Sequence, residues 1–149
     1  MLQLKDRAVL ITGAKGGLGT YVTKAFLCAG AGVSGVSRSI QASDFDHPGF
    51  HPVAAELAGG EAARKVVDSV LAKWNRLDAV VHLVGGFAGG KGVEDTDDAT
   101  VERMLDMNFR SAFYIFRAAL PAMRAQRSGR ILAIGSRAAQ DPQSGLAAY

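Results

Sequence analysis

Residues 12–19 form a glycine-rich segment whose composition suits the binding of a phosphate. After a short apolar run at residues 8–11, the chain reads Thr12-Gly13-Ala14-Lys15-Gly16-Gly17-Leu18-Gly19. Where such a segment joins a strand to a helix, unpaired backbone N–H groups at the helix start bind a dinucleotide pyrophosphate. Glycine is required because side chains would block the turn, the phosphates or the packing of the helix. A tight turn without a ligand is the alternative, and the neighbouring elements decide between the two.

Two cations near this segment indicate which dinucleotide would bind. The apolar run at residues 33–37 ends in Ser37-Arg38 and carries no carboxylate there. A carboxylate at that place would hydrogen-bond the adenosine ribose of NAD, whereas a cation neutralises the additional phosphate of NADP. Lys15 supplies a second cation within the turn. These residues favour NADP over NAD, and a solvated Arg38 at the end of a strand is the alternative.

Strands and helices alternate along the chain and would position these residues. Short apolar runs predict strands at residues 8–11, 33–37, 51–55, 77–84 and 131–134. Apolar residues at helical spacing predict helices at 18–29, 61–74 and 98–126, the last bent near Pro121. Residues 39–50 have neither period, so we expect a loop with at most one helical turn. The alternation predicts an α/β fold, a Rossmann-type doubly wound parallel sheet with helices on both faces.

Composition places the chain among folded globular domains and excludes several other classes. Its 149 residues suffice for one domain, with 48% hydrophobic and 21% charged residues. The net charge of +3 comes from scattered Lys and Arg, so an ordinary basic surface is favoured over a nucleic-acid site. A single cysteine, Cys28, allows no internal disulfide, and no Cys/His cluster predicts a metal. The first apolar run is too short for a membrane segment, and we expect a cytoplasmic protein.

The glycine spacing Thr-Gly-x-x-x-Gly-x-Gly resembles the cofactor-binding signature of the short-chain dehydrogenase/reductase family. Later matches follow in the family's order over essentially the whole chain. By this resemblance Thr12 braces the turn, and the cofactor is bound by Gly13, Lys15, Gly17, Leu18 and Gly19. Glu56-Leu57, after the third strand, is similar to the Asp-Val pair that frames the adenine in the family. An acidic residue preceding a helix is the alternative for Glu56.

The fourth strand ends in His82-Leu83-Val84-Gly85, where the family most often has Asn-Asn-Ala-Gly. Gly85 still lets the backbone pass close to the cofactor. The stabilising role of the family's first asparagine either passes to His82 or is lost. For His82 itself, a structural histidine with satisfied hydrogen bonds is favoured over a catalytic one.

Ser136 and Tyr149 are thirteen residues apart, which is the spacing of the catalytic serine and tyrosine in the family. The resemblance implies that Ser136 hydrogen-bonds a substrate carbonyl, that Tyr149 is the acid or base, and that NADPH supplies hydride. Asn108 matches the family asparagine that binds a water of the proton relay. It lies on an otherwise apolar helical stripe with Val101, Met104, Leu105, Ala112, Ile115 and Ala119. An asparagine that merely ties down a neighbouring strand is the alternative.

A second apolar stripe on the same helix, Phe109, Phe113, Phe116 and Leu120, needs a cover. The family pairs this helix with its copy in another subunit, so we expect a homodimer or homotetramer through residues 108–120. Packing against a further part of the same chain is the alternative.

A phenol titrates near 10 and needs a nearby cation to act as a base at neutral pH. The family places a lysine four residues after the tyrosine, beyond the end of this sequence. We therefore expect residues 1–149 to be an incomplete domain, lacking roughly a hundred residues, with little or no turnover alone. The substrate would be a small carbonyl or alcohol compound. A non-catalytic NADP-binding sensor or scaffold is the alternative function, for which residues 82–85 are the best argument.

Overall fold

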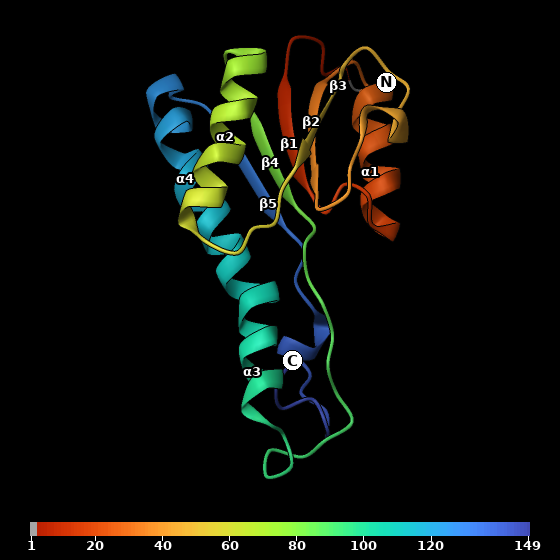
Figure 1. Ribbon diagram of the computed structural model, residues 1–149, viewed down its shortest axis with the longest axis vertical. Helices are drawn as coiled ribbons and strands as arrows, with labels where there is room; N and C mark the ends of the chain where they lie inside the picture. The colour runs from red at the N-terminus through yellow and green to blue at the C-terminus, as the bar shows by residue number, and fades with distance from the viewer. Residues whose placement is uncertain (1–2) are drawn as a thin grey trace.

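The computed structural model describes residues 3–149 and contains one parallel sheet with helices on both faces (Figure 1). The strands are β1 (Ala8–Thr12), β2 (Gly32–Ser37), β3 (Phe50–Ala54), β4 (Ala79–His82) and β5 (Arg130–Ala133). Their order is β3-β2-β1-β4-β5, and every neighbouring pair is parallel. The order reverses at β1 and β4, where successive crossovers leave toward opposite faces and open a crevice at the carboxyl ends. The predicted doubly wound α/β sheet is confirmed.

Four helices accompany the sheet: α1 (Gly17–Cys28), α2 (Gly60–Trp74), α3 (Asp98–Leu105) and α4 (Ser111–Gln126). Helix α1 covers one face of the sheet, and α2 and α4 lie together on the other (Figure 1). Helix α3 and the loop before it project beyond the carboxyl edge of the strands, beside the C-terminus (Figure 1). The loop expected at residues 39–50 contains one short helical turn, Ala42–Asp44. Within residues 3–149, no helix has the length and apolar composition needed to span a bilayer.

Alternation along β1 divides the core into two layers. Val9 and Ile11 pack on the α1 side with Leu27, whereas Leu10 packs on the other side with Ile115 of α4. All five residues of β1 are buried, as expected for a central strand covered on both faces. Each fully buried aliphatic side chain contributes roughly 1.5–3 kcal/mol. The buried strand β1 therefore fixes the position of its carboxyl end, where the glycine-rich turn begins.

Helix α2 packs one face against the sheet and α4. Ala63 is fully buried, whereas Ala62 is half-buried. Trp74 closes the helix, and its Nε1 donates to Ser34 Oγ at 2.9 Å. A Cβ at Gly32 would lie 2.9 Å from the Trp74 ring, so β2 approaches this indole through a glycine.

The long helix predicted at residues 98–126 is interrupted at Asp106–Arg110, and not near Pro121. Those five residues form a wide π turn, in which the Ser111 N–H donates to the Asp106 carbonyl. Helix α4 then continues through Pro121 to its end. The additional residue in the turn rotates the following face. The buried positions are accordingly Met104, Ser111, Ile115, Ala119 and Met123. Of the residues predicted on this stripe, Val101, Leu105 and Asn108 are exposed.

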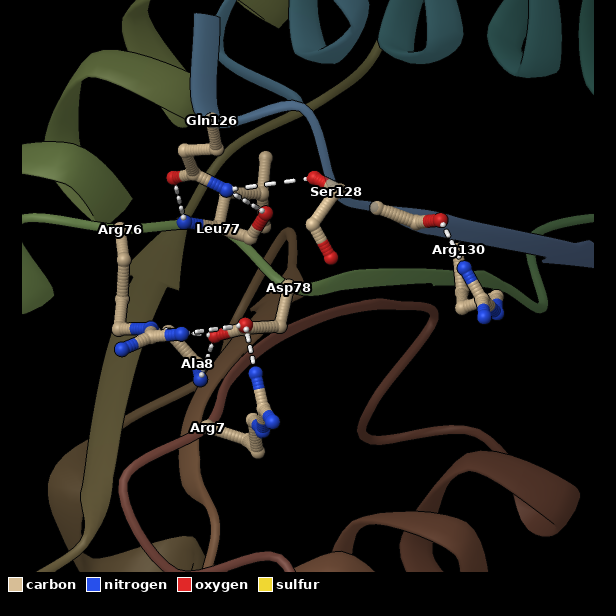
Figure 2. A network of polar contacts seen from close by, with 9 residues as sticks. Arg7, Ala8, Arg76, Leu77, Asp78, Gln126, Ser128 and Arg130 are labelled. Atoms are coloured by element: carbon tan, nitrogen blue, oxygen red, sulfur yellow. Dashed lines mark hydrogen bonds and ion pairs between the residues drawn. The ribbon is translucent and has the colours of Figure 1, made fainter. Parts of the chain in front are cut away.

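Asp78 joins the amino ends of β1 and β4 (Figure 2). Its carboxylate accepts from Arg76 at 2.6 and 2.7 Å, from Arg7 at 3.0 Å and from the backbone N–H of Ala8 at 2.8 Å. Partial burial alone would raise the pKa of Asp78, but these donors outweigh it and lower the pKa to about 2.

Gln126 fastens the end of α4 to the same edge of the sheet (Figure 2). Its Oε1 accepts from the N–H of Leu77, and its Nε2 donates to the carbonyl of Leu77, both at 2.9 Å. The Gln126 amide thus pairs both backbone groups of Leu77, as a neighbouring strand would, one residue before Asp78. The two contacts hold the start of β4 against β1 and against α4.

Replacing Asp78 with asparagine should lower the free energy of unfolding by about 2 kcal/mol at pH 7, at about 1.4 kcal/mol per unit of pKa shift. The folded pKa lies below the unfolded value of 3.8, so the charged form stabilises the folded state above about pH 4. That stabilisation is lost as the pH falls toward 2. Urea unfolding at pH 7 and pH 3.5 measures the difference, which should shrink at the lower pH. The exposed carboxylate of Asp68 on α2 is the matched control, and an equal loss in Asp68→Asn would contradict this role for Asp78.

Candidate active site

A cleft of about 700 Å³ opens at the carboxyl edge of the sheet, where the strand order reverses between β1 and β4. Several predicted cofactor-binding residues line it: Gly13, Lys15, Ser37, Arg38, Glu56, Leu57 and Gly85. The other predicted residues, Gly17, Leu18 and Gly19, form the first turn of α1. The structure therefore brings the ends of β1, β2 and β4 and the residues after β3 to one cavity, as expected of a switch point.

The three pattern glycines are needed for three different reasons. Gly13 has φ +70°, and a Cβ there would lie 3.1 Å from the backbone of Leu83 after β4. A Cβ at Gly19 would overlap the carbonyl oxygen of Gly13, so this glycine lets α1 approach the turn rather than the sheet. A Cβ at Gly17 would meet no atom within 4 Å in the described part of the chain beyond its own helix. The space in front of Gly17 is open, which suits a bound phosphate.

Among residues 3–149, no side chain satisfies the backbone donors at the start of α1. Its N-cap is Gly16, which makes no side-chain cap, and the first turn contains no acidic residue. The first N–H groups of a helix lack partners within the helix, and the helix dipole favours an anion at this end. Together with the open space at Gly17, these donors fit a dinucleotide pyrophosphate.

Polar contacts fix the turn to the end of β2, where an adenosine would lie. The backbone N–H of Lys15 donates to Ser37 Oγ at 3.1 Å, and the ammonium of Lys15 donates to the Ser39 carbonyl at 3.1 Å. Arg38 is largely exposed and lies 3.9 Å from the carboxylate of Glu56 across the cleft. Both predicted cations therefore stand at the rim of the cavity.

His82, the last residue of β4, links β1 to α4. Its Nδ1 lies 2.8 Å from Thr12 Oγ1, and its Nε2 lies 3.3 Å from Ser111 Oγ. Ser111 donates its own proton to the Met107 carbonyl at 2.7 Å, so the imidazole must donate through Nε2–H and accept from Thr12 through Nδ1. Burial lowers the pKa of His82 to about 4, which keeps the ring neutral at physiological pH. The expectation of a satisfied structural histidine is confirmed.

Asn108, in the π turn, holds the backbone that follows β4. Its Oδ1 accepts from the N–H of Gly86 at 2.9 Å, and its Nδ2 donates to the carbonyl of Gly86 at 3.0 Å. A Cβ at Gly85 would lie 3.0 Å from this amide, so a glycine is needed for the approach. Sequence reasoning placed Asn108 on a buried stripe, but the wide turn leaves it exposed, with its amide tying down the neighbouring segment.

Ser136 and Tyr149 lie on the segment that follows β5. Ser136 Oγ accepts from the N–H of Ala138 at 3.2 Å and begins a short helical turn, Arg137–Ala139. Tyr149 is 41% exposed, and its ring packs edge-on against Phe87 with centroids 5.0 Å apart. Neither residue lines the cleft, and no hydrogen bond joins their hydroxyls within residues 3–149. Their role therefore stays a prediction.

The second apolar stripe, which runs from the π turn into α4, is largely uncovered. Phe109 is 62% exposed and Phe113 49%, with Leu120 at 38%. Phe116 differs, because its ring packs edge-on against His82 at 5.7 Å. On the edge strand β5, Ile131 and other apolar residues are also exposed.

Sequence reasoning missed several residues of the cleft wall: Asp106, Met107, Arg110, Ser111 and Tyr114. They lie in the π turn or just after it, and the additional residue of that turn could not be read from a regular helical period. Of these residues, the sequence could have indicated Ser111, because a serine hydroxyl one turn after Asn108 would need a polar partner if it were buried. Within residues 3–149, no group of three His, Cys, Asp or Glu side chains could hold a metal ion.

Comparison with known proteins gives consistent matches along the chain. The family model described as short chain dehydrogenase matches residues 7–149. Short chain dehydrogenase adrF of Penicillium roqueforti is 30% identical over 151 aligned residues, which cover 100% of this chain and 59% of the relative. The structure of gox2181 has a TM-score of 0.91 at 25% identity and covers 99% of this chain and 61% of that one. NADH-dependent reductase A1-R′ complexed with NAD has a TM-score of 0.87 at 24% identity, covering 98% and 66%, and shows the same fold.

Replacing His82 with leucine should cost about 1–3 kcal/mol of unfolding free energy at pH 7.5, because the buried hydroxyl of Ser111 loses its donor. The folded pKa of about 4 lies below the ordinary 6.5, so the wild type should lose stability as the pH falls from 6.5 toward 4. The leucine variant should lose less over that range. Urea unfolding at pH 7.5 and pH 5 measures both effects. His47→Gln, in the exposed loop before β3, is the control, and an unchanged pH dependence in His82→Leu would contradict the assignment.

Proposed function

Because the chain belongs to the short-chain dehydrogenase family, we propose that it is the dinucleotide-binding part of an oxidoreductase that interconverts a carbonyl and an alcohol. The observation that supports this most is the cleft at the β1–β4 reversal, which is lined by Gly13 and by Gly16, the N-cap residue at the uncapped start of α1. A Cβ at Gly17 would contact none of the described residues beyond its own helix, so packing alone does not explain the glycine there.

NADP is the cofactor that we propose, in preference to NAD. The end of β2 carries Ser37 and Arg38 and no carboxylate, and Lys15 and Arg38 both line the cavity. A guanidinium can form two parallel hydrogen bonds to a phosphate, which gives Arg38 the larger part in recognising the 2′-phosphate. Leu57, which is buried in the cavity wall, would lie against the adenine.

Ser136 and Tyr149 are the residues proposed to act on the substrate. The cofactor, when bound, supplies or removes the hydride. The hydroxyl of Ser136 accepts the Ala138 N–H through a lone pair, so its proton stays available for the carbonyl oxygen. Tyr149 would donate its phenolic proton to that oxygen, or accept it in the reverse direction, once a cation stabilises the phenolate. Asn108 would act here by holding Gly86 and the segment that carries Phe87.

The exposed apolar stripe of α4 supports an oligomer as part of this proposal. Phe109, Phe113 and Leu120 would pack against the same helix of a second copy in a homodimer or homotetramer. The charged side chain of Arg117 lies over the Phe113 ring at 5.2 Å, at the border of this surface.

Arg38→Ala should weaken binding of NADPH about tenfold and leave NADH binding nearly unchanged, since only NADPH carries the 2′-phosphate. Nucleotide fluorescence titrations of both reduced dinucleotides give the two dissociation constants. Arg64→Ala, on the exposed side of α2, controls for the loss of one positive charge. Equal weakening of both dinucleotides by Arg38→Ala would contradict the NADP preference.

Tyr149→Phe should lower turnover at least about a hundredfold, because proton transfer by a positioned group contributes about 10²–10⁴-fold. The assay is NADPH oxidation with a panel of reactive carbonyls, in a version of the chain extended beyond Tyr149 as in the longer relatives. NADPH affinity should stay the same in the variant. Tyr21→Phe, an exposed tyrosine of α1, is the control. Unchanged turnover in Tyr149→Phe would exclude this mechanism and favour a dinucleotide-binding sensor.

A further inference from the structure

We propose that Asp44 is a specificity-determining residue, which lowers the affinity of the cleft for a 2′-phosphorylated dinucleotide by competing with the phosphate for Lys15. The inference rests on the proposed function and adds a residue outside the cavity. Asp44 ends the short helical turn Ala42–Asp44 in the loop between β2 and β3.

The ammonium of Lys15 is already engaged in the structure. It lies 2.9 Å from Asp44 Oδ1 and donates to the carbonyl of Ser39 at 3.1 Å. Lys15 and Ser39 line the cleft, whereas Asp44 does not. The carboxylate therefore holds the cation from outside the cavity, and a phosphate inside it would find one of the three ammonium donors free.

Asp44 is itself fixed, so it cannot retreat when a phosphate arrives. Its second oxygen, Oδ2, accepts from the backbone N–H of Gln41 at 2.7 Å in a reciprocal cap of the helical turn. Its side chain is 23% exposed, whereas that of Lys15 is 42% exposed. The hydrogen bonds from Lys15 and Gln41 keep the pKa of Asp44 below its ordinary value, so the group is charged at neutral pH.

The rim of the cleft thus carries two cations that are each paired with a carboxylate. Arg38 lies 3.9 Å from Glu56, with both side chains more than 60% exposed, so this contact is readily exchanged for solvent or ligand. The Lys15–Asp44 pair is shorter and less exposed. A phosphate that approached Lys15 would lie close to a fixed negative charge, and this repulsion offsets the attraction of the ammonium. A ribose with a free 2′-hydroxyl carries no such charge and is indifferent to Asp44.

The test is a titration of the full chain and its Asp44→Asn variant with NADPH and with NADH, followed by nucleotide fluorescence. Asparagine retains an oxygen that can accept from Gln41, so the turn keeps its cap. We expect NADPH to bind about five- to tenfold more tightly to the variant, with NADH binding changed less than about twofold. Asp46→Asn, an exposed carboxylate in the same loop, makes the same change in net charge and should alter either affinity by less than about twofold.

The same Asp44→Asn substitution, made in a Lys15→Ala variant, shows whether Asp44 acts through Lys15. In Lys15→Ala, the gain from Asp44→Asn should fall below about twofold, because no ammonium then draws the phosphate toward position 44. An equal gain in both backgrounds, or an unchanged or weaker affinity for NADPH in Asp44→Asn, would overturn the inference. If the wild-type chain bound neither dinucleotide, the proposed function itself would fail. Binding of both without an effect of Asp44→Asn would remove this inference alone.

Discussion

The contact on which the cleft depends is the buried polar chain from Thr12 through His82 to Ser111. A neutral imidazole between two hydroxyls satisfies every donor and acceptor of the buried ring. Thr12 and His82 are also register partners of β1 and β4, so the side chains extend a contact that the backbone begins. Because Thr12 precedes Gly13, the glycine-rich turn leaves the sheet from a fixed point.

The same series of hydrogen bonds fixes the position of the first residue of α4, Ser111. Ser111 can reach His82 because the π turn at Asp106–Arg110 inserts a residue before it. The turn also places Asn108 over the backbone of Gly86, which holds the segment leaving β4. A regular helix would direct different residues to these two partners. The irregularity therefore shapes the wall of the cleft, as π turns often do at functional sites.

At the opposite edge of the sheet, the amino ends of the strands are connected by ion pairs and side-chain hydrogen bonds. Asp78 gathers donors from the start of β1 and from Arg76, and Gln126 closes the far end of α4 on Leu77. Strand β4 is only four residues long, so its two ends are fixed by side chains as much as by strand pairing. Side chains therefore hold both ends of β4, next to the crevice between β1 and β4.

The sequence alone determined the order of elements, the sheet type and the position of the glycine-rich turn, because apolar periodicity and glycine spacing are local properties. It also indicated the residues at the ends of β1, β2 and β4, since parallel strands end at one edge. The tertiary structure alone decided which polar groups meet. The partners of His82, the clamp of Asn108 on Gly86 and the pairing of Lys15 with Asp44 join residues that no local period relates. Met104, Ile115 and Ala119 are buried as the helical period predicted, whereas Val101, Leu105 and Asn108, before or within the π turn, are exposed. The sequence did not indicate this turn, because a helical period read from residue types assumes a regular helix.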